Sequence, residues 1–144
     1  MKNTLLVLLS LIMIVFSTSA FAKKVEKMPV ERDGLYYEHL SPNLANGTYE
    51  IYYDNGQLKA IGTFKDGKED GLYESYWSNG QPQNKKTYKN GELDGLFVWY
   101  YDNGQLKWRY TYKDGKLNGL DEGYNKDGTL KSKCFYQNSK KYEC

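Results

Sequence analysis

The side chains that could carry out chemistry in this chain are few. His39 is the only histidine, so any catalytic arrangement that needs an imidazole must use it. Glu50, Glu74 and Glu122 recur at one position of an internal repeat. If successive hairpins stack, these carboxylates lie roughly 10 Å apart, which is too far for the pair of a retaining glycosidase. Recurrence at a repeat position indicates a structural role, so we expect no catalytic residue and predict that the protein is not an enzyme.

The sequence has few residues that could bind a metal ion or a cofactor. Cys134 and Cys144 are the two cysteines, and His39 is far from both in sequence. Two thiols alone make a poor structural metal site, and the Asp-Gly and Asn-Gly pairs lack the ordered oxygen ligands of calcium-binding loops. We predict no metal and no cofactor. The simplest interpretation of the cysteines is one intramolecular disulfide worth roughly 2–3 kcal/mol, with an intermolecular bridge or a metal pair as alternatives.

Aromatic side chains are the remaining candidates for a functional site. The chain has 15 Tyr, 5 Phe and 3 Trp. Exposed rings beside Lys107, Arg109 and Lys131 would suit an extended peptide or sugar rings, whereas buried rings would simply form a thin core. The candidate binding residues are Trp77, Trp99, Tyr101, Trp108, Tyr52, Tyr76 and Tyr100.

The charge balance limits the class of partner. The chain has 20 Lys and Arg against 18 Asp and Glu. A protein that binds nucleic acid usually shows a clear basic excess, so no nucleic-acid partner is predicted. A protein partner or a polymer of the cell envelope fits this composition better.

The amino terminus has the pattern of a secretory signal peptide at residues 1–22. Lys2 supplies a positive start, residues 5–16 are almost entirely apolar, and Ala22 ends a small-x-small cleavage site before Lys23. The apolar run is short for a membrane span, although an uncleaved anchor is the alternative. We therefore predict cleavage between Ala22 and Lys23, no membrane span afterwards, and a secreted or periplasmic protein whose cysteines meet an oxidising compartment.

The elements that must position the aromatic rings belong to a repeat of 24 residues, which occurs in four copies. The copies open at Gly47, Gly71, Gly95 and Gly119. A fixed period of this length predicts stacked supersecondary units. The predicted organisation is a flexible lead at residues 23–33 and a repeat domain at residues 34–144, with a degenerate half repeat before Gly47 in which residues 36–40 form a return strand.

Each copy has the pattern of one β-hairpin. In the third copy, Asn103-Gly104 separates two runs of aromatic and β-branched residues, which predicts a two-residue type I′ turn between two strands. The whole is predicted to be all-β: an elongated antiparallel meander of stacked β-hairpins in a single twisted sheet. Because such a sheet has open edges, we expect weak self-association through them.

Two side-chain arrangements follow from this geometry. A two-residue turn at Asn55-Gly56 would place Tyr49 and Ile51 on the packed face and Tyr52 on the other, whereas a bulge would reverse this. The fourth copy favours the reverse, because it keeps Leu120 and Tyr124 but replaces the other set with Asp121, Gly123 and Asn125. In the last hairpin, Cys134 and Cys144 fall directly opposite each other, at a separation that a disulfide can span.

The repeat resembles a known family. The phrase G-x-Y-x-x-Y-Y-x-N-G-Q-L-K at residues 47–59, with F-K-D-G-K-x-x-G ending at Gly71, is similar to the MORN-variant repeat of exported bacterial proteins. The resemblance covers residues 34–144 in some form, and it implies consecutive β-hairpins with a role in binding or scaffolding. We expect a protein-binding or scaffold module at the cell envelope or outside the cell. The alternatives are a cell-wall or glycan-binding module and an antitoxin- or immunity-like protein, a label that some bacterial relatives of the repeat carry.

Overall fold

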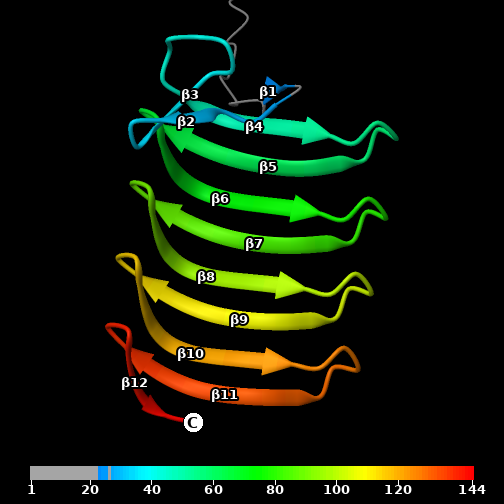
Figure 1. Cartoon of the computed structure of the whole chain (residues 1–144), viewed down its shortest axis with the longest axis vertical. Coiled ribbons are helices and arrows are strands. Elements are labelled where there is room, and N and C mark those ends of the chain that lie inside the picture. Colours follow the sequence, from blue (N-terminus) through cyan, green and yellow to red (C-terminus); the bar gives the residue numbers. More distant parts are fainter. Residues whose placement is uncertain (1–22, 26) are drawn as a thin grey trace, which may run out of the picture.

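The chain forms one long sheet of stacked hairpins. The computed structural model describes residues 23–25 and 27–144, and the predicted signal peptide lies outside them. Ten strands pair in the order β1-β4-β5-β6-β7-β8-β9-β10-β11-β12, and β2 and β3 form a separate two-stranded sheet. Figure 1 shows the hairpins following one another along the long axis of the molecule. The strands are β1 (Lys23–Lys24), β2 (Val30–Arg32), β3 (Leu35–Tyr37), β4 (Gly47–Tyr52), β5 (Leu58–Lys65), β6 (Lys68–Tyr76), β7 (Pro82–Lys89), β8 (Glu92–Tyr100), β9 (Leu106–Lys113), β10 (Lys116–Tyr124), β11 (Leu130–Gln137) and β12 (Lys140–Glu143).

The predicted fold class is confirmed. The described residues contain no helix, and every strand from β4 to β12 pairs antiparallel with the next strand in the sequence. The sheet does not close on itself, because β1 and β12 end the strand order. A single layer of this kind stabilises itself mainly through contacts between neighbouring hairpins.

The hairpins close through three-residue loops along one end of the strands, which we call the loop edge (residues 54–56, 78–80, 102–104 and 126–128). Tyr53 N–H donates to Gln57 O at 2.9 Å, and Gly56 N–H donates to Tyr53 O at 2.9 Å. Of the three loop residues only Gly56 has a positive φ, 83°. This is the pattern of a type I turn followed by a glycine bulge. The predicted two-residue type I′ turn at Asn55-Gly56 is therefore wrong.

Two-residue turns do occur, at the opposite end of the strands, which we call the turn edge (residues 66–67, 90–91, 114–115 and 138–139). Asp66 has φ 49° and Gly67 has φ 74°, and Lys65 pairs with Lys68 across them. Two consecutive positive φ values are what a type I′ turn needs. Asn138 and Ser139 keep the same conformation, with φ 48° and 62°, although the glycine is missing.

The register settles which side chains share a face. Ile51 pairs with Ala60 and Tyr49 with Gly62, because a one-residue shift between Ile51 and Tyr52 compensates for the longer loop. Tyr49 and Ile51 consequently lie on the packed face, and Tyr52 lies on the other. The first of the two predicted arrangements holds, although the loop that produces it has three residues.

One face carries the rings of successive strands, and we call it the aromatic face (Tyr49, Phe64, Tyr73, Tyr88, Phe97, Trp99, Trp108, Tyr110 and Tyr112). The opposite face carries alternating acidic and basic residues, and we call it the charged face (Glu50, Glu74, Lys85, Arg109, Glu122 and Lys133). The side chains of a strand alternate between the two faces, so both patterns come from the same strands.

The first hairpin is covered by the N-terminal part of the chain. We call this part the N-terminal cover (Val25 and residues 27–45). Ala45, Tyr49 and Phe64 form a buried cluster, and the Tyr36 ring lies 5.1 Å from that of Phe64. The predicted lead at residues 23–33 contains the short strands β1 and β2. The expected return strand at residues 36–40 does not extend the large sheet, because β3 pairs with β2 across the Asp33-Gly34 turn.

Hydrogen bonds at both edges tie each hairpin to the next. At the loop edge, the side-chain amides of Asn55, Asn79 and Asn103 donate to main-chain carbonyls of the following loop at 3.3, 3.0 and 3.1 Å. At the turn edge, the main-chain N–H groups of Gly91 and Gly115 donate to carbonyls of the preceding hairpin at 2.7 and 2.9 Å. These ladders fix the stacking of the hairpins.

Candidate binding site

The N-terminal cover lies over the first hairpin and reaches the edge of β6, and the rest of the aromatic face is the candidate site. The N-terminal cover packs against Phe64 and its neighbours. From β6 to β10 the sheet order places no other strand over the face within the described chain. Trp99 has 36% of its surface exposed, and no aromatic residue of this part falls in the buried class. We call these residues the open aromatic face (Tyr73, Tyr88, Phe97, Trp99, Trp108, Tyr110 and Tyr112).

The rings of β8 and β9 contact one another across the two strands. The Phe97 ring centroid lies 5.6 Å from that of Tyr110 and 6.4 Å from that of Tyr112. The planes of Trp108 and Tyr110 are within 15° of each other, with centroids 6.1 Å apart. Aromatic pairs at such separations stabilise the face on which they lie and hold the rings in place before any partner arrives.

Trp108 lies over a gap in the neighbouring strand. A Cβ atom at Gly123 would approach Trp108 Cζ3 to 2.3 Å, so the indole occupies the space that a side chain at this position would need. A larger residue at position 123 would therefore collide with the ring on β9. The reversed arrangement that Gly123 favoured from the sequence is wrong for this reason.

Lys86 places a positive charge among the rings. Its Nζ lies 5.4 Å from the centroid of Tyr73 and 5.3 Å from that of Phe97. An ammonium group over aromatic faces is attracted to both. Within the described part of the chain, no carboxylate lies within ion-pair distance of this ammonium.

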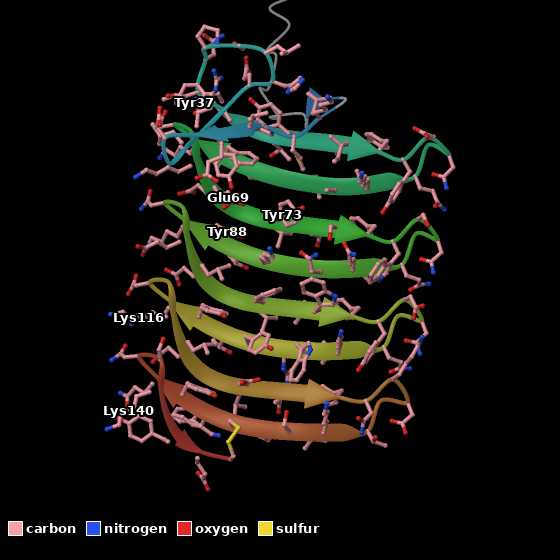
Figure 2. All side chains as sticks on the ribbon, in the orientation of Figure 1. Tyr37, Glu69, Tyr73, Tyr88, Lys116 and Lys140 are labelled. Carbon is pink, nitrogen blue, oxygen red and sulfur yellow. A yellow bond between two sulfur atoms is a disulfide. The ribbon has the colours of Figure 1, made fainter. Side chains whose placement is uncertain are left out.

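Two carboxylates border the open aromatic face. Burial raises the pKa of Glu69, and the charge of Lys86 offsets part of this shift. Burial also raises the pKa of Asp121, with Lys141 acting in the opposite direction. Burial raises the pKa of Tyr88 to about 12, and the Glu69 carboxylate adds to the shift. Figure 2 shows Glu69, Tyr73 and Tyr88 gathered below β2 and β3.

Carboxylates and cations of the charged face form ion pairs with one another. Glu122, 4% exposed, accepts hydrogen bonds from Arg109 Nε at 2.9 Å and Nη2 at 2.5 Å, and Lys133 Nζ lies 3.1 Å from its other oxygen. Burial acts to raise the pKa of Glu122, but the hydrogen bonds and charges of Lys133 and Arg109 together lower it. Glu74 forms the equivalent pair with Lys85 at 2.6 Å. These cations are therefore already paired within the sheet.

The seven candidate residues from the sequence separate into three places. Trp99 and Trp108 are a cross-strand pair on the open aromatic face. Trp77 and Tyr101 lie next to the loop edge, where the Tyr101 hydroxyl donates to Tyr124 O at 3.0 Å.

The other three candidates, Tyr52, Tyr76 and Tyr100, lie on the side of the charged face. The Tyr52 hydroxyl donates to Glu50 at 2.6 Å, and that of Tyr76 donates to Glu74. Sequence reasoning missed Tyr73, Lys86, Phe97 and Tyr110. The signal that could have found Phe97 and Tyr110 is the two-residue alternation along β8 and β9 from Trp99 and Trp108. Tyr73 and Lys86 lie on β6 and β7, and their place on this face follows from the cross-strand pairing.

Within the described residues, the side chains that could support chemistry stay apart. No three or more His, Cys, Asp or Glu side chains are grouped there as metal ligands, and His39 is exposed. The same part of the chain offers no apolar helix of membrane-spanning length. The predicted disulfide between Cys134 and Cys144 is confirmed, with an S–S distance of 2.02 Å, and it joins β11 to the chain just after β12.

Comparison with known proteins identifies the repeat. The family model described as MORN repeat variant matches four consecutive segments, at residues 45–66, 69–90, 93–114 and 117–138. These segments make up more than half of the chain, and each spans one loop of the loop edge. No curated protein matches the chain closely enough to count as a relative.

Proposed function

The chain belongs to the MORN repeat variant family, and on that premise we propose that it is an exported, non-enzymatic module that binds a protein partner at the cell envelope or outside the cell. MORN repeats generally act as binding modules for proteins or membranes. The proposed binding surface is the open aromatic face.

The observation that carries the proposal is the chemical difference between the two faces. On the charged face, Glu74 and Glu122 are paired with neighbouring cations. On the open aromatic face, Trp99 and its neighbours are partly exposed and their rings contact one another. The exposed apolar side chains that β6, β8 and β10 place on the charged face are instead single leucines: Leu72, Leu96 and Leu120. Exposed aromatic clusters on a soluble surface commonly mark interaction sites, and aromatic residues are enriched at the centres of protein interfaces.

The proposal of export rests on the amino terminus and on the cysteines. Residues 1–22 have the charge, the apolar run and the cleavage pattern of a signal peptide. The Cys134–Cys144 disulfide is suited to an oxidising compartment. We expect the protein recovered from outside the cytoplasm to begin at Lys23, which intact-mass spectrometry and N-terminal sequencing would check. A full-length protein retained in the cytoplasm would contradict export.

The binding surface can be tested with a matched pair of variants. Trp99 and Leu96 lie on the same strand, on opposite faces, with 36% and 47% of their surfaces exposed. We expect the purified protein to capture a protein from an envelope fraction, and we expect Trp99→Ala to lose this capture while Leu96→Ala keeps it. Equal loss in both variants, or capture of purified wall polymer in place of protein, would reject the proposal, the second in favour of the glycan-binding alternative.

A further inference from the structure

The N-terminal cover shows what kind of chain fits the aromatic face. It is a polypeptide with few regular elements of its own, and it reaches the face through apolar and aromatic side chains. Met28 Cε lies 3.6 Å from the position that a Cβ would take at Gly62, and the Tyr36 ring meets Phe64 at 5.1 Å with a tilt of 57°. The same sheet thus already has one polypeptide interface on this face.

The covered and open parts of the face are continuous. Gly62 pairs with Tyr73, Tyr73 with Lys86, and Lys86 with Phe97, so one row of cross-strand partners runs from below the cover to the open rings. The cover contributes Glu31 and Tyr36 to a cleft of about 340 Å³ at the turn edge, where Lys68, Glu69 and Gly91 also line it. On the row itself, Lys86 and Phe97 are partly exposed.

The charged side chains of the open part differ in how closely a group of opposite charge approaches them. The charged residues of the aromatic face between β6 and β10 are Glu69, Lys86 and Asp121. The Lys86 ammonium lies between the rings of Tyr73 and Phe97 and forms no ion pair with a described carboxylate, although the Glu69 carboxylate is near enough to interact with its charge. A carboxylate from outside would complement this cation in surroundings that are partly shielded from water, where a charge pair is stronger than in bulk solvent.

We infer that the partner binds as an extended polypeptide segment that continues the path of the N-terminal cover over the open aromatic face and places an Asp or Glu carboxylate beside Lys86. Neighbouring strands are about 4.8 Å apart, and alternate side chains of an extended segment are about 6.6–6.8 Å apart. A segment that crosses the strands therefore brings an apolar or aromatic side chain over Phe97 and Tyr110 two residues away from the carboxylate. This inference rests on the proposed function, because it specifies the partner of the same face.

The test uses a phage-displayed library of random peptides selected on the purified protein. We expect enriched sequences with Asp or Glu two residues from an aromatic or aliphatic residue. The Lys86→Glu variant should enrich Lys or Arg at that position instead. An unchanged consensus in Lys86→Glu, or no enriched sequence on the unsubstituted protein, would overturn the inference.

A second measurement isolates the charge contact. The enriched peptide is compared with its amide analogue, in which Asp or Glu is replaced by Asn or Gln. The unsubstituted protein and Lys86→Arg should bind the amide analogue about tenfold more weakly, whereas Lys86→Met should bind both peptides equally. Lys85→Met is the matched control, because Lys85 is adjacent but pairs with Glu74 on the charged face, and it should keep the tenfold preference.

The outcome is separable from that of the proposed function. Trp99-dependent capture of an envelope protein without any acidic consensus would reject this inference and leave the proposed function standing. An acidic consensus that depends on Lys86, with no captured envelope protein, would support the peptide-binding mode and reject an envelope protein as the partner. Selection of glycans rather than peptides by the same face would overturn the inference.

Discussion

At the scale of single residues, one atom distinguishes the internal repeats from the last. Asn103 occupies the middle of its loop and donates its side-chain amide to Lys126 O in the next loop. Asp127 occupies the same position in the fourth loop, and its carboxylate accepts from Thr129 N–H at 2.9 Å. Both side chains satisfy their own loop, but only the amide can also donate to a following one, and no loop of this kind follows Asp127 in the described structure.

This difference gives a prediction with an internal control. Asn103→Asp replaces a donor by an oxygen that faces a carbonyl, so it should lower the free energy of unfolding by about 1 kcal/mol, or the midpoint of thermal unfolding by a few degrees. Asp127→Asn should leave the midpoint within error. Circular dichroism during heating measures both. Equal effects of the two substitutions would show that the amide-to-carbonyl bond does not stabilise the stack.

Trp77 is the residue at which the ladder of the loop edge is incomplete. At the equivalent positions, the Tyr53 hydroxyl donates to Tyr76 O at 2.7 Å and the Tyr101 hydroxyl donates to Tyr124 O at 3.0 Å. Within the described structure, Trp77 Nε1 is buried and has no acceptor. An unpaired buried donor costs free energy that a hydroxyl in the right place would recover.

We therefore expect Trp77→Tyr to stabilise the protein. Its hydroxyl would reach Tyr100 O, as in the other repeats, and the free energy of unfolding should rise by about 1 kcal/mol. Tyr101→Phe removes the corresponding bond and should lower it by a similar amount. Urea unfolding followed by fluorescence measures both, and a destabilised Trp77→Tyr would show that ring volume outweighs the hydrogen bond at this position.

At the scale of strands, Glu122 links three strands of the sheet. Its carboxylate on β10 bonds Arg109 on β9 and Lys133 on β11. Its pKa in the folded protein is lowered, whereas an unfolded Glu has a pKa of about 4.3. The ionised carboxylate consequently contributes stability above about pH 4, and this contribution is lost as the pH falls through the lower folded pKa.

Glu122→Gln tests this contribution by its pH dependence. The variant should be less stable by about 1–2 kcal/mol at neutral pH, and the difference from the unsubstituted protein should shrink as the pH falls below about 4. Glu69 and Asp121, whose raised pKa values act in the opposite direction, are present in both proteins and cancel in the comparison. Urea unfolding at a series of pH values gives the difference, and a constant difference across the series would contradict the assignment.

The strands also show how far the sequence could predict the structure. The Asn55-Gly56 pair predicts a type I′ turn, since Asn-Gly is its strongest signal, yet this signal does not specify how many residues the loop has. Asp54 adds a third residue, and the type I′ turn forms at Asp66-Gly67 instead. The two strands per repeat follow from the period together with the aromatic and β-branched runs on either side of Asn-Gly.

The candidate site was predictable only in part. Trp99 and Trp108 are large rings at hairpin positions, so composition alone identified them. Trp77 and Tyr101 have the same composition signal but lie beside a loop, where their polar atoms face the next repeat. Which ring is exposed depends on the register shift beside the loop and on where the N-terminal cover folds back, and neither follows from periodicity.

At the scale of the whole molecule, stability is distributed along the stack rather than held in one core. The buried hydrophobic residues are few and include Ala45, Phe64 and Val98, which lie in different repeats or in the cover. In such an array each hairpin depends mainly on its neighbours, so the ends open first. The Cys134–Cys144 disulfide restrains one of these ends.

Reduction of this disulfide should act locally. We expect Cys134→Ser/Cys144→Ser to increase amide hydrogen exchange in β11 and β12 while exchange in β6 and β7 stays unchanged, because the strands β8, β9 and β10 separate the two regions. Loss of protection along the whole sheet would show that the array unfolds as one cooperative unit.

The loop-edge ladder also bears on how a chain of this kind can lengthen. Each internal hairpin brings both a donor amide for the hairpin after it and an acceptor carbonyl for the hairpin before it. A duplicated unit inserted between existing repeats would find both neighbours already matched. A unit appended after the fourth would meet Asp127, which has no amide to offer. Insertion of a duplicated repeat between existing repeats therefore preserves every such hydrogen bond, whereas addition after the fourth repeat does not. The difference between Asn103 and Asp127 thus favours lengthening of the array at internal positions.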